Sequence, residues 1–158
     1  MHGLLERLAP LAADAREEVG AKGLTAVDDL AALKTVLAIL DEPKFAWMFG
    51  EGSLAEVKIA GPVAGLGGRS VSGYIDRLVV REGGVDIVDF KSGRPHDEMP
   101  EAYLRQLSVY AAVLREIYPG SEVRAHLLWI DVPRLDLAKD EALEAALLRT
   151  KQDLSSRE

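Results

Sequence analysis

The sequence predicts an α/β protein with a mixed β-sheet flanked by helices. Segments with apolar residues at helical spacing alternate with runs rich in β-branched residues, in the order α-α-β-β-β-α-β-α. A Gly83-Gly84 pair between two of these runs indicates a β-hairpin. A chain of 158 residues is long enough for one domain with a single core, so residues 1–158 are expected to form one domain.

Two helices are expected before the first strand. Leucines at helical spacing predict one amphipathic helix over residues 1–19. Glycines within residues 20–23 interrupt this pattern, and Thr25 is placed to cap a second helix that Pro43 ends. We interpret the aromatic residues of segment 45–49 as a lid packed over the sheet rather than as a surface that stacks on bases.

The remaining elements follow from alternation, helical spacing and the positions of proline and glycine. In order, they are a strand over 53–60, a loop over 61–68, the hairpin within 71–91, an exposed loop over 92–96, a helix over 100–118, a strand over 123–130 that Pro133 ends, and a charged amphipathic helix over 137–154.

The hairpin places acidic and basic side chains close together. If it turns symmetrically at residues 82–83, Asp76 lies opposite Asp89 and Tyr74 lies opposite Lys91. Directly opposed residues share a face with Cβ atoms about 5 Å apart. Asp89 and Lys91 are two positions apart on one strand, so they share that face as well. The register therefore predicts a cluster of two carboxylates and one ammonium group.

Two carboxylates held close together among Val, Ile and Leu repel each other and lose hydration. A divalent cation relieves this conflict, and hard oxygen ligands suit Mg²⁺ or Mn²⁺. Lys91 is then placed to orient or help deprotonate a metal-bound water. The alternative is a simple ion pair at the strand end, between Lys91 and either aspartate, and such pairs are common and weak.

Three motifs occur in a fixed order: G-Y-I-D ending at Asp76, V-D-F-K ending at Lys91, and Q-x-x-x-Y from Gln106 to Tyr110. The ordered set resembles the RecB-type nuclease branch of the PD-(D/E)XK superfamily, from about residue 54 to residue 130. The resemblance implies a restriction-endonuclease-like core. It also implies catalytic roles for Asp76, Asp89, Lys91, Gln106 and Tyr110, metal binding by both aspartates and the Phe90 carbonyl, and DNA contacts by Gln106 and Tyr110.

Three further residues are candidates for the site. His2 opens a segment similar to the family's first-helix motif H-x-L-L-x-x-L, which implies a metal ligand, but a frayed chain end is the alternative. Glu56 lies where family members often carry an acid, so it either completes the metal shell or pairs with Lys58 or Arg69. Arg94, in the loop after Lys91, is placed to meet a DNA phosphate.

Composition excludes several classes of protein. Cysteine is absent, so the four-cysteine iron–sulfur cluster of some RecB-type relatives is excluded. No apolar run approaches the ~20 residues of a membrane span, and no membrane partner is expected. The net charge of −7 is unusual for a DNA-binding protein, yet residues 57–95 carry six basic side chains against four acidic ones.

These observations predict a Mg²⁺- or Mn²⁺-dependent DNA nuclease, expected to be an exonuclease. The resemblance is strongest to the C-terminal nuclease of an AddA-type helicase–nuclease subunit, which acts in bacterial double-strand break repair. It implies that the chain is a fragment, with a helicase region and a second subunit as partners, in the bacterial cytoplasm near the nucleoid. The alternatives are a catalytically silent module that binds DNA ends or docks a partner, and a free-standing exonuclease of the same superfamily.

Overall fold

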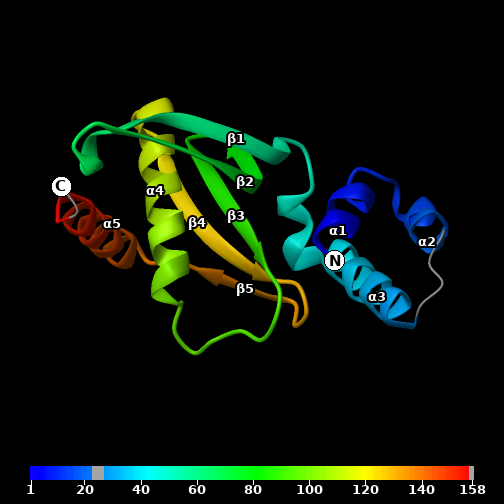
Figure 1. The fold of residues 1–158 in the computed structure, drawn as a ribbon. Helices are drawn as coiled ribbons and strands as arrows, with labels where there is room; N and C mark the ends of the chain where they lie inside the picture. The colour runs from blue at the N-terminus through cyan, green and yellow to red at the C-terminus, as the bar shows by residue number, and fades with distance from the viewer. Residues whose placement is uncertain (23–26, 157–158) are drawn as a thin grey trace.

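The computed structural model describes residues 1–22 and 27–156, so the predicted Thr25 cap lies outside the described residues. Five strands form one sheet, and helices lie on both of its faces (Figure 1). The elements are α1 (His2–Leu8), α2 (Ala13–Ala21), α3 (Val27–Asp41), the 3-10 helix η1 (Pro43–Met48), β1 (Ser53–Val63), the 3-10 helix η2 (Ala64–Leu66), β2 (Arg69–Arg81), β3 (Gly84–Lys91), α4 (Glu101–Ile117), β4 (Glu122–Trp129), β5 (Arg134–Leu137) and α5 (Asp140–Ser155).

The sheet is mixed, which confirms the predicted fold class. Its strand order is β1-β2-β3-β4-β5, with β3 and β4 parallel and the other neighbours antiparallel. Helix α4 connects the two parallel strands, because parallel neighbours require a long crossover. This arrangement is consistent with the restriction-endonuclease-like fold.

Each face of the sheet has its own hydrophobic core. One core includes residues of α4, α5 and strands β1 to β4, among them Ile75, Leu107 and Leu127. The other includes residues of α1, α3 and η1, packed against Val88 and Phe90 of β3. Phe45 and Met48 are fully buried in this second core, so the prediction that segment 45–49 covers the sheet is confirmed.

The register of the hairpin is confirmed over five pairs, from Arg77 opposite Val88 to Arg81 opposite Gly84. Gly83 makes the turn with a positive φ of 73°, a conformation that costs glycine little. Counted from the turn, however, the ladder ends at Arg77 and does not reach Asp76. The predicted pairs Asp76–Asp89 and Tyr74–Lys91 are therefore not part of the ladder between β2 and β3. On the other edge of β2, Tyr74 pairs with Lys58 of β1.

Several element boundaries differ from the sequence predictions. The helix expected over residues 1–19 is two helices, because Pro10 lies between α1 and α2 and cannot donate a backbone hydrogen bond. Strand β1 continues to Val63, into the expected loop. The short strand β5 lies where the last helix was expected to begin, because it completes the sheet beside β4. Helix α5 then begins at Asp140.

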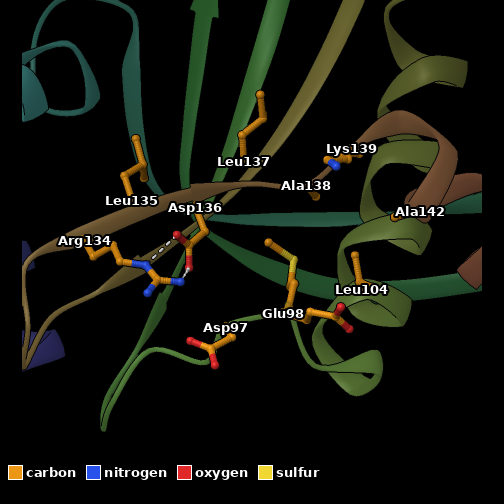
Figure 2. A pocket seen from close by; sticks show the side chains of 11 residues that line it. Asp97, Glu98, Leu104, Arg134, Leu135, Asp136, Leu137, Ala138, Lys139 and Ala142 are labelled. Carbon is orange, nitrogen blue, oxygen red and sulfur yellow. Dashed lines mark hydrogen bonds and ion pairs between the residues drawn. The ribbon is translucent and has the colours of Figure 1, made fainter.

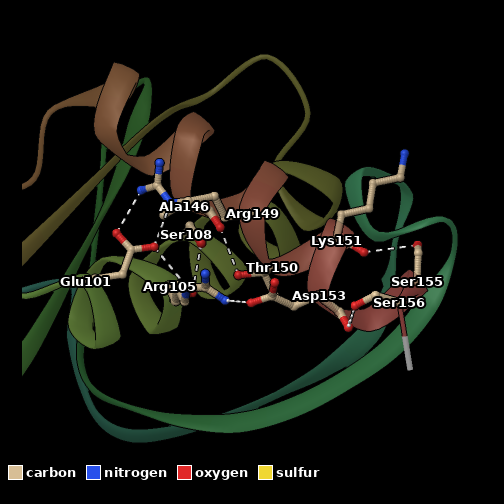
Figure 3. A network of polar contacts seen from close by, with 10 residues as sticks. All are labelled: Glu101, Arg105, Ser108, Ala146, Arg149, Thr150, Lys151, Asp153, Ser155 and Ser156. Atoms are coloured by element: carbon tan, nitrogen blue, oxygen red, sulfur yellow. Dashed lines mark hydrogen bonds and ion pairs between the residues drawn. The ribbon is translucent and has the colours of Figure 1, made fainter. Parts of the chain in front are cut away.

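Surface ion pairs join α5 to α4 (Figure 3). Arg149 makes two hydrogen bonds to Glu101, each 2.7 Å long, and Arg105 binds both Glu101 and Asp153. Exposed pairs of this kind contribute only about 0–1 kcal/mol each. The burial of Leu143 and Ala146 therefore holds α5 in place, and the ion pairs set its orientation.

No helix within the described residues is long and apolar enough to span a bilayer.

Candidate active site

The two strands of the hairpin separate at Asp76. The Asp76 carboxylate inserts where the ladder ends, and the backbone N–H of Phe90 donates to Asp76 Oδ2 at 2.7 Å. The Asp76 carboxylate thus accepts a hydrogen bond from a backbone N–H group. In an uninterrupted ladder, a backbone carbonyl of the neighbouring strand accepts that bond. At this point a hydrogen bond that fixes an acidic side chain therefore replaces one backbone hydrogen bond between the strands.

The facing of β2 reverses at the same position. Ile75 and Leu78 both belong to the core on the α4 side, although residues three apart in a regular strand face opposite sides. On β1, Glu56 is the residue opposite Asp76 in the register, and it has a φ of 49°, which is uncommon for a residue other than glycine. Because of this reversal, the adjacent residues Asp76 and Arg77 both contact α1. Ile75 and Leu78, on either side of them, pack on the α4 side.

Asp89 belongs to a polar network with Lys91 and α4. Lys91 Nζ lies 2.6 Å from Asp89 Oδ2, and the Gln106 amide donates to Asp89 Oδ1 at 3.2 Å. The Lys91 ammonium also donates to Gln106 Oε1 at 3.2 Å, and Gln106 Nε2 lies 3.3 Å from the Tyr110 hydroxyl. The structure therefore brings together four of the residues predicted from sequence, and Gln106 bridges the other three.

Helix α4 reaches this network because Gly73 lets it approach β2 closely. A Cβ atom on Gly73 would lie 2.7 Å from the Tyr110 ring and hydroxyl. Lys91 is held further by Tyr103, whose ring centroid lies 4.4 Å from Nζ, a cation–π contact. The sequence prediction omitted Tyr103, although its spacing of three residues before Gln106 placed it on a neighbouring turn.

Helix α1 delivers His2 to the other aspartate. His2 Nε2 lies 3.4 Å from Asp76 Oδ1, and the imidazole packs against the Phe90 ring with centroids 5.1 Å apart. His2 is the first residue of α1. The structure thus joins the first helix to the hairpin at Asp76.

A buried ion pair anchors α1 in that position. Arg77 donates to Glu6 Oε2 at 2.8 Å and to Ser53 Oγ at 3.1 Å, and its guanidinium lies 5.1 Å from the centroid of the Phe49 ring. Glu6 and Arg77 were not predicted as site residues. Their signal in the sequence is positional, because Glu6 is one helical turn after His2 and Arg77 directly follows Asp76.

Burial dominates the electrostatics of the site. Asp89 is only 3% exposed, and burial raises its pKa above the ordinary value. The charge of Asp76 raises the pKa further, whereas Lys91 and His2 offset part of the effect. Burial likewise raises the pKa of Glu6, and Arg77 counteracts it. A buried carboxylate with a raised pKa is under-stabilised in its charged form and favours an additional cation nearby.

The donor set suits a hard divalent cation, although the ligands do not all converge. Among the described residues no group of three or more His, Asp or Glu side chains is arranged to hold a metal ion. His2 Nε2 and Glu6 Oε1 are nevertheless buried atoms without a hydrogen-bond partner, and His2 Nε2 faces Asp76. The oxygens of Asp76 and Asp89 with the His2 nitrogen therefore fit Mg²⁺ or Mn²⁺ by ligand chemistry.

Two predicted residues stay outside this cluster. Glu56 is exposed on β1, and Arg94 is exposed in the loop after β3. Glu56 still lies close enough for its charge to raise the pKa of Glu6. The assignment of the Phe90 carbonyl to a metal stays a prediction, since the contact seen in the structure is made by the Phe90 N–H.

A separate cavity of about 480 Å³ lies beside β5 (Figure 2). Its walls come from the loop before α4, from β5 and from the start of α5, and no predicted site residue lines it. Acidic and basic side chains alternate around it, including Asp97, Arg134 and Lys139. Because none of its lining residues belongs to the carboxylate cluster, the cavity is distinct from that cluster.

The family assignment follows from a comparison over the whole site. The model of the PD-(D/E)XK nuclease superfamily matches residues 2–157, which include His2, both aspartates, Lys91 and the α4 residues. The chain belongs to this superfamily. PD-(D/E)XK proteins are typically metal-dependent nucleases, and the carboxylate cluster of this member lies where β2 and β3 separate.

Solved structures were also compared with this PD-(D/E)XK member. The crystal structure of SSO0001 has a TM-score of 0.45 at 14% identity, and the match covers 98% of this chain and 85% of that chain. Protein VC1899 from Vibrio cholerae has a TM-score of 0.37 at 15% identity, covering 98% of this chain and 51% of that one. No curated protein matches the chain.

Proposed function

We propose that this chain is a DNA nuclease that uses Mg²⁺ or Mn²⁺ to hydrolyse phosphodiester bonds. The observation that carries the proposal is the network of Asp89, Lys91 and Gln106 beside the His2–Asp76 pair, in a member of a nuclease superfamily. Asp76, Asp89 and His2 would hold the cation, and Glu56 is a further candidate ligand. When bound, the cation supplies positive charge to the phosphate during the reaction.

The residues of this chain have distinct roles in the proposal. Lys91 is placed to orient the attacking water and to stabilise negative charge that develops on the phosphate. Gln106 fixes Lys91 and Asp89 in position through its amide, and Tyr110 supports Gln106. Because Asp89 is almost fully buried, water competes poorly for these contacts, which favours a preorganised site. Arg94 would contact the DNA backbone.

The test is cleavage of linear and closed circular DNA by the purified chain with Mg²⁺, Mn²⁺ or EDTA. Cleavage is expected with either metal and not with EDTA, and the Asp89→Ala protein should be inactive. The matched control is Asp14→Ala, which removes an exposed carboxylate on α2 and should cut as wild type does. Metal-dependent activity that survives Asp89→Ala would overturn the assignment of the site.

A catalytically silent module that binds DNA ends is the second candidate. The observation that favours it is the absence, among the residues that the structure describes, of three converging metal ligands. The same experiment separates the two functions. A silent module would bind DNA ends without cutting, and calorimetric titration with Mn²⁺ would detect no metal binding that depends on Asp89.

We further propose exonuclease action within an AddA-type helicase–nuclease that repairs double-strand breaks in the bacterial cytoplasm. The first-helix motif at His2 and the lack of cysteine support this finer assignment. An exonuclease requires a free end, so linear DNA should be degraded while closed circular DNA resists. Co-purification with a helicase region or a second subunit would support the partners. A free-standing exonuclease would instead degrade linear DNA equally fast with and without a helicase region or a second subunit.

A further inference from the structure

The hairpin of β1 and β2 has one face that no other element of the described residues covers. Six residues on this face, which we name the hairpin face, are all exposed: Lys58, Ala60, Pro62, Ser70, Ser72 and Tyr74. They form three cross-strand pairs, because Lys58 lies opposite Tyr74, Ala60 opposite Ser72 and Pro62 opposite Ser70. The alternate residues, such as Ile59 and Ile75, are buried on the α4 side.

The hairpin face leads into the candidate active site. Tyr74 is two residues before Asp76 on β2, a separation of about 7 Å along an extended strand. In Figure 1 the hairpin of β1 and β2 extends past one end of α4, away from helices α1, α2 and α3. Helix α1 contacts Asp76 through His2, whereas the residues of the hairpin face are exposed.

The segment that carries the hairpin face differs from the rest of the protein in its charge. Residues 57–75 contain two basic side chains, Lys58 and Arg69, and no acidic one. The whole chain carries a net charge of −7, so an acid-free stretch of this length next to the site is a local exception. A polyanion that approaches the carboxylate cluster along residues 57–75 meets no acidic side chain of that segment.

Tyr74 differs from the other three tyrosines of the chain. Tyr103, Tyr110 and Tyr118 pack against the core on the α4 side, whereas Tyr74 is 60% exposed. Its ring is flanked by the small side chains of the hairpin face and lies opposite the Lys58 stem. An exposed ring beside a cation and small residues is a platform on which an unstacked base can lie.

We propose that the hairpin face binds single-stranded DNA and guides it to the active site, with Tyr74 stacking on a base and Lys58 contacting a phosphate. The inference rests on the proposed nuclease function and adds to it the form of the substrate. A single strand is favoured over a duplex because bases paired within a duplex do not expose their faces to a protein ring. Tyr74 and Lys58 thus position the strand rather than take part in the chemistry.

Binding is measured first, in EDTA, by the fluorescence anisotropy of a labelled single-stranded oligonucleotide. Tyr74→Ala should weaken binding about tenfold, and Tyr74→Phe by less than about twofold, because stacking needs the ring and not the hydroxyl. Lys58→Gln should lower the slope of log affinity against log salt by about 0.7, the value for one phosphate contact on a single strand. Lys22→Gln, which removes an exposed cation directly after α2, is the matched control and should leave the slope unchanged.

Cross-linking identifies the contact directly. An oligonucleotide with 5-iododeoxyuridine should cross-link to Tyr74 on irradiation, as located by mass spectrometry. Equal binding by wild type and Tyr74→Ala would overturn the inference, as would equal losses in the Ala and Phe variants. Because EDTA prevents cleavage, these results are independent of the nuclease proposal. If Tyr74→Ala binds DNA as wild type does and metal-dependent cleavage is present, the proposed role of the hairpin face is rejected and the nuclease proposal stands. Unchanged DNA binding is also the result expected if this face docks a protein.

Discussion

Asp89 carries a charge that its surroundings stabilise poorly. Its carboxylate is buried, and apart from the Lys91 ammonium no hydrogen-bond donor in the described chain reaches Oδ2. Burial and the nearby Asp76 both raise its pKa, so the charged form gains more from a divalent cation than an exposed carboxylate would. The geometry around Asp89 therefore favours metal binding even though the ligands do not yet converge.

His2 should affect manganese more than magnesium. Imidazole nitrogen suits Mn²⁺ better than Mg²⁺, whereas carboxylate oxygens suit both. We expect His2→Ala to weaken Mn²⁺ binding roughly tenfold and Mg²⁺ binding less. Isothermal titration of the two metals checks this, with His96→Ala as the control because His96 packs on Trp129 and is not one of the proposed ligands. Identical Mn²⁺ titrations for wild type and His2→Ala would remove His2 from the proposed ligands.

At the scale of elements, a buried ion pair connects α1 to the sheet. Arg77 and Glu6 come from β2 and α1, and both side chains are largely inaccessible. A buried ion pair is costly to break, because the remaining partner is a buried charge without compensation. The pair therefore fixes α1 against β2 and holds His2 beside Asp76.

Removing one partner should destabilise the fold, and removing both should not. Arg77→Met is expected to lower the free energy of unfolding by about 3–5 kcal/mol, since Glu6 stays buried and charged. The double variant Glu6→Met with Arg77→Met should recover most of that loss. Urea unfolding at neutral pH measures both. A double variant as unstable as the single one would indicate that Arg77 acts through packing alone, for example on Phe49.

A second buried carboxylate connects three strands. Asp86 on β3 is fully buried and binds Arg81 of β2 at 2.7 Å, Arg124 of β4 at 2.7 Å and His126 of β4 at 3.0 Å. Burial alone would raise the pKa of Asp86, but the hydrogen bonds from His126, Arg124 and Arg81 outweigh it and hold the pKa well below its usual range. The carboxylate thus stabilises the folded state in its charged form.

The contribution of Asp86 should depend on pH. A depressed folded pKa means that this stabilisation is complete above the ordinary value of about 3.8 and is lost as pH falls below it. Asp86→Asn should therefore cost about 3–5 kcal/mol at pH 7 and progressively less below about pH 4. Urea unfolding from pH 7 to pH 3 tests this, with the exposed Asp14→Asn as control. A cost independent of pH would assign the loss to packing.

At the scale of the whole molecule, charge is distributed against DNA binding. Residues 1–56 contain ten acidic side chains and five basic ones, so their net charge is −5. Helix α1, formed by part of this segment, contacts Asp76 through His2. DNA that approaches from the side of this segment is repelled, whereas residues 57–75 carry no acidic side chain.

The isolated chain should consequently bind DNA weakly and with marked salt dependence. If Lys58, Arg69, Lys91 and Arg94 each meet a phosphate, log affinity for single strands should fall by about 3 per unit of log salt. If the chain is tethered to a helicase motor that holds the DNA strand, the higher local DNA concentration would compensate for the weak binding. Anisotropy titrations at several salt concentrations, for the chain alone and for a longer chain, check this. Tight binding by the chain alone that does not change with salt would contradict it.

Much of the site could be predicted because its determinants are local. The register of the β2–β3 hairpin follows from the Gly83 turn and from alternation within a few residues. It is confirmed from Arg77 to Arg81. The one-turn spacing of Gln106 and Tyr110 places both side chains on the same network. Such patterns are set by backbone geometry alone, so the sequence by itself determined the hairpin, the helix and the residues that meet there.

Only the tertiary structure decided how these parts meet. The end of the ladder at Asp76, the reversal of facing beside Glu56 and the arrival of His2 from α1 each depend on contacts between residues far apart in the chain. The same holds for Glu6 and Arg77, which are 71 positions apart, and for β5, which becomes a strand because β4 offers it a free edge. Long-range packing selects among local conformations that are similar in free energy, and local sequence patterns do not contain that choice.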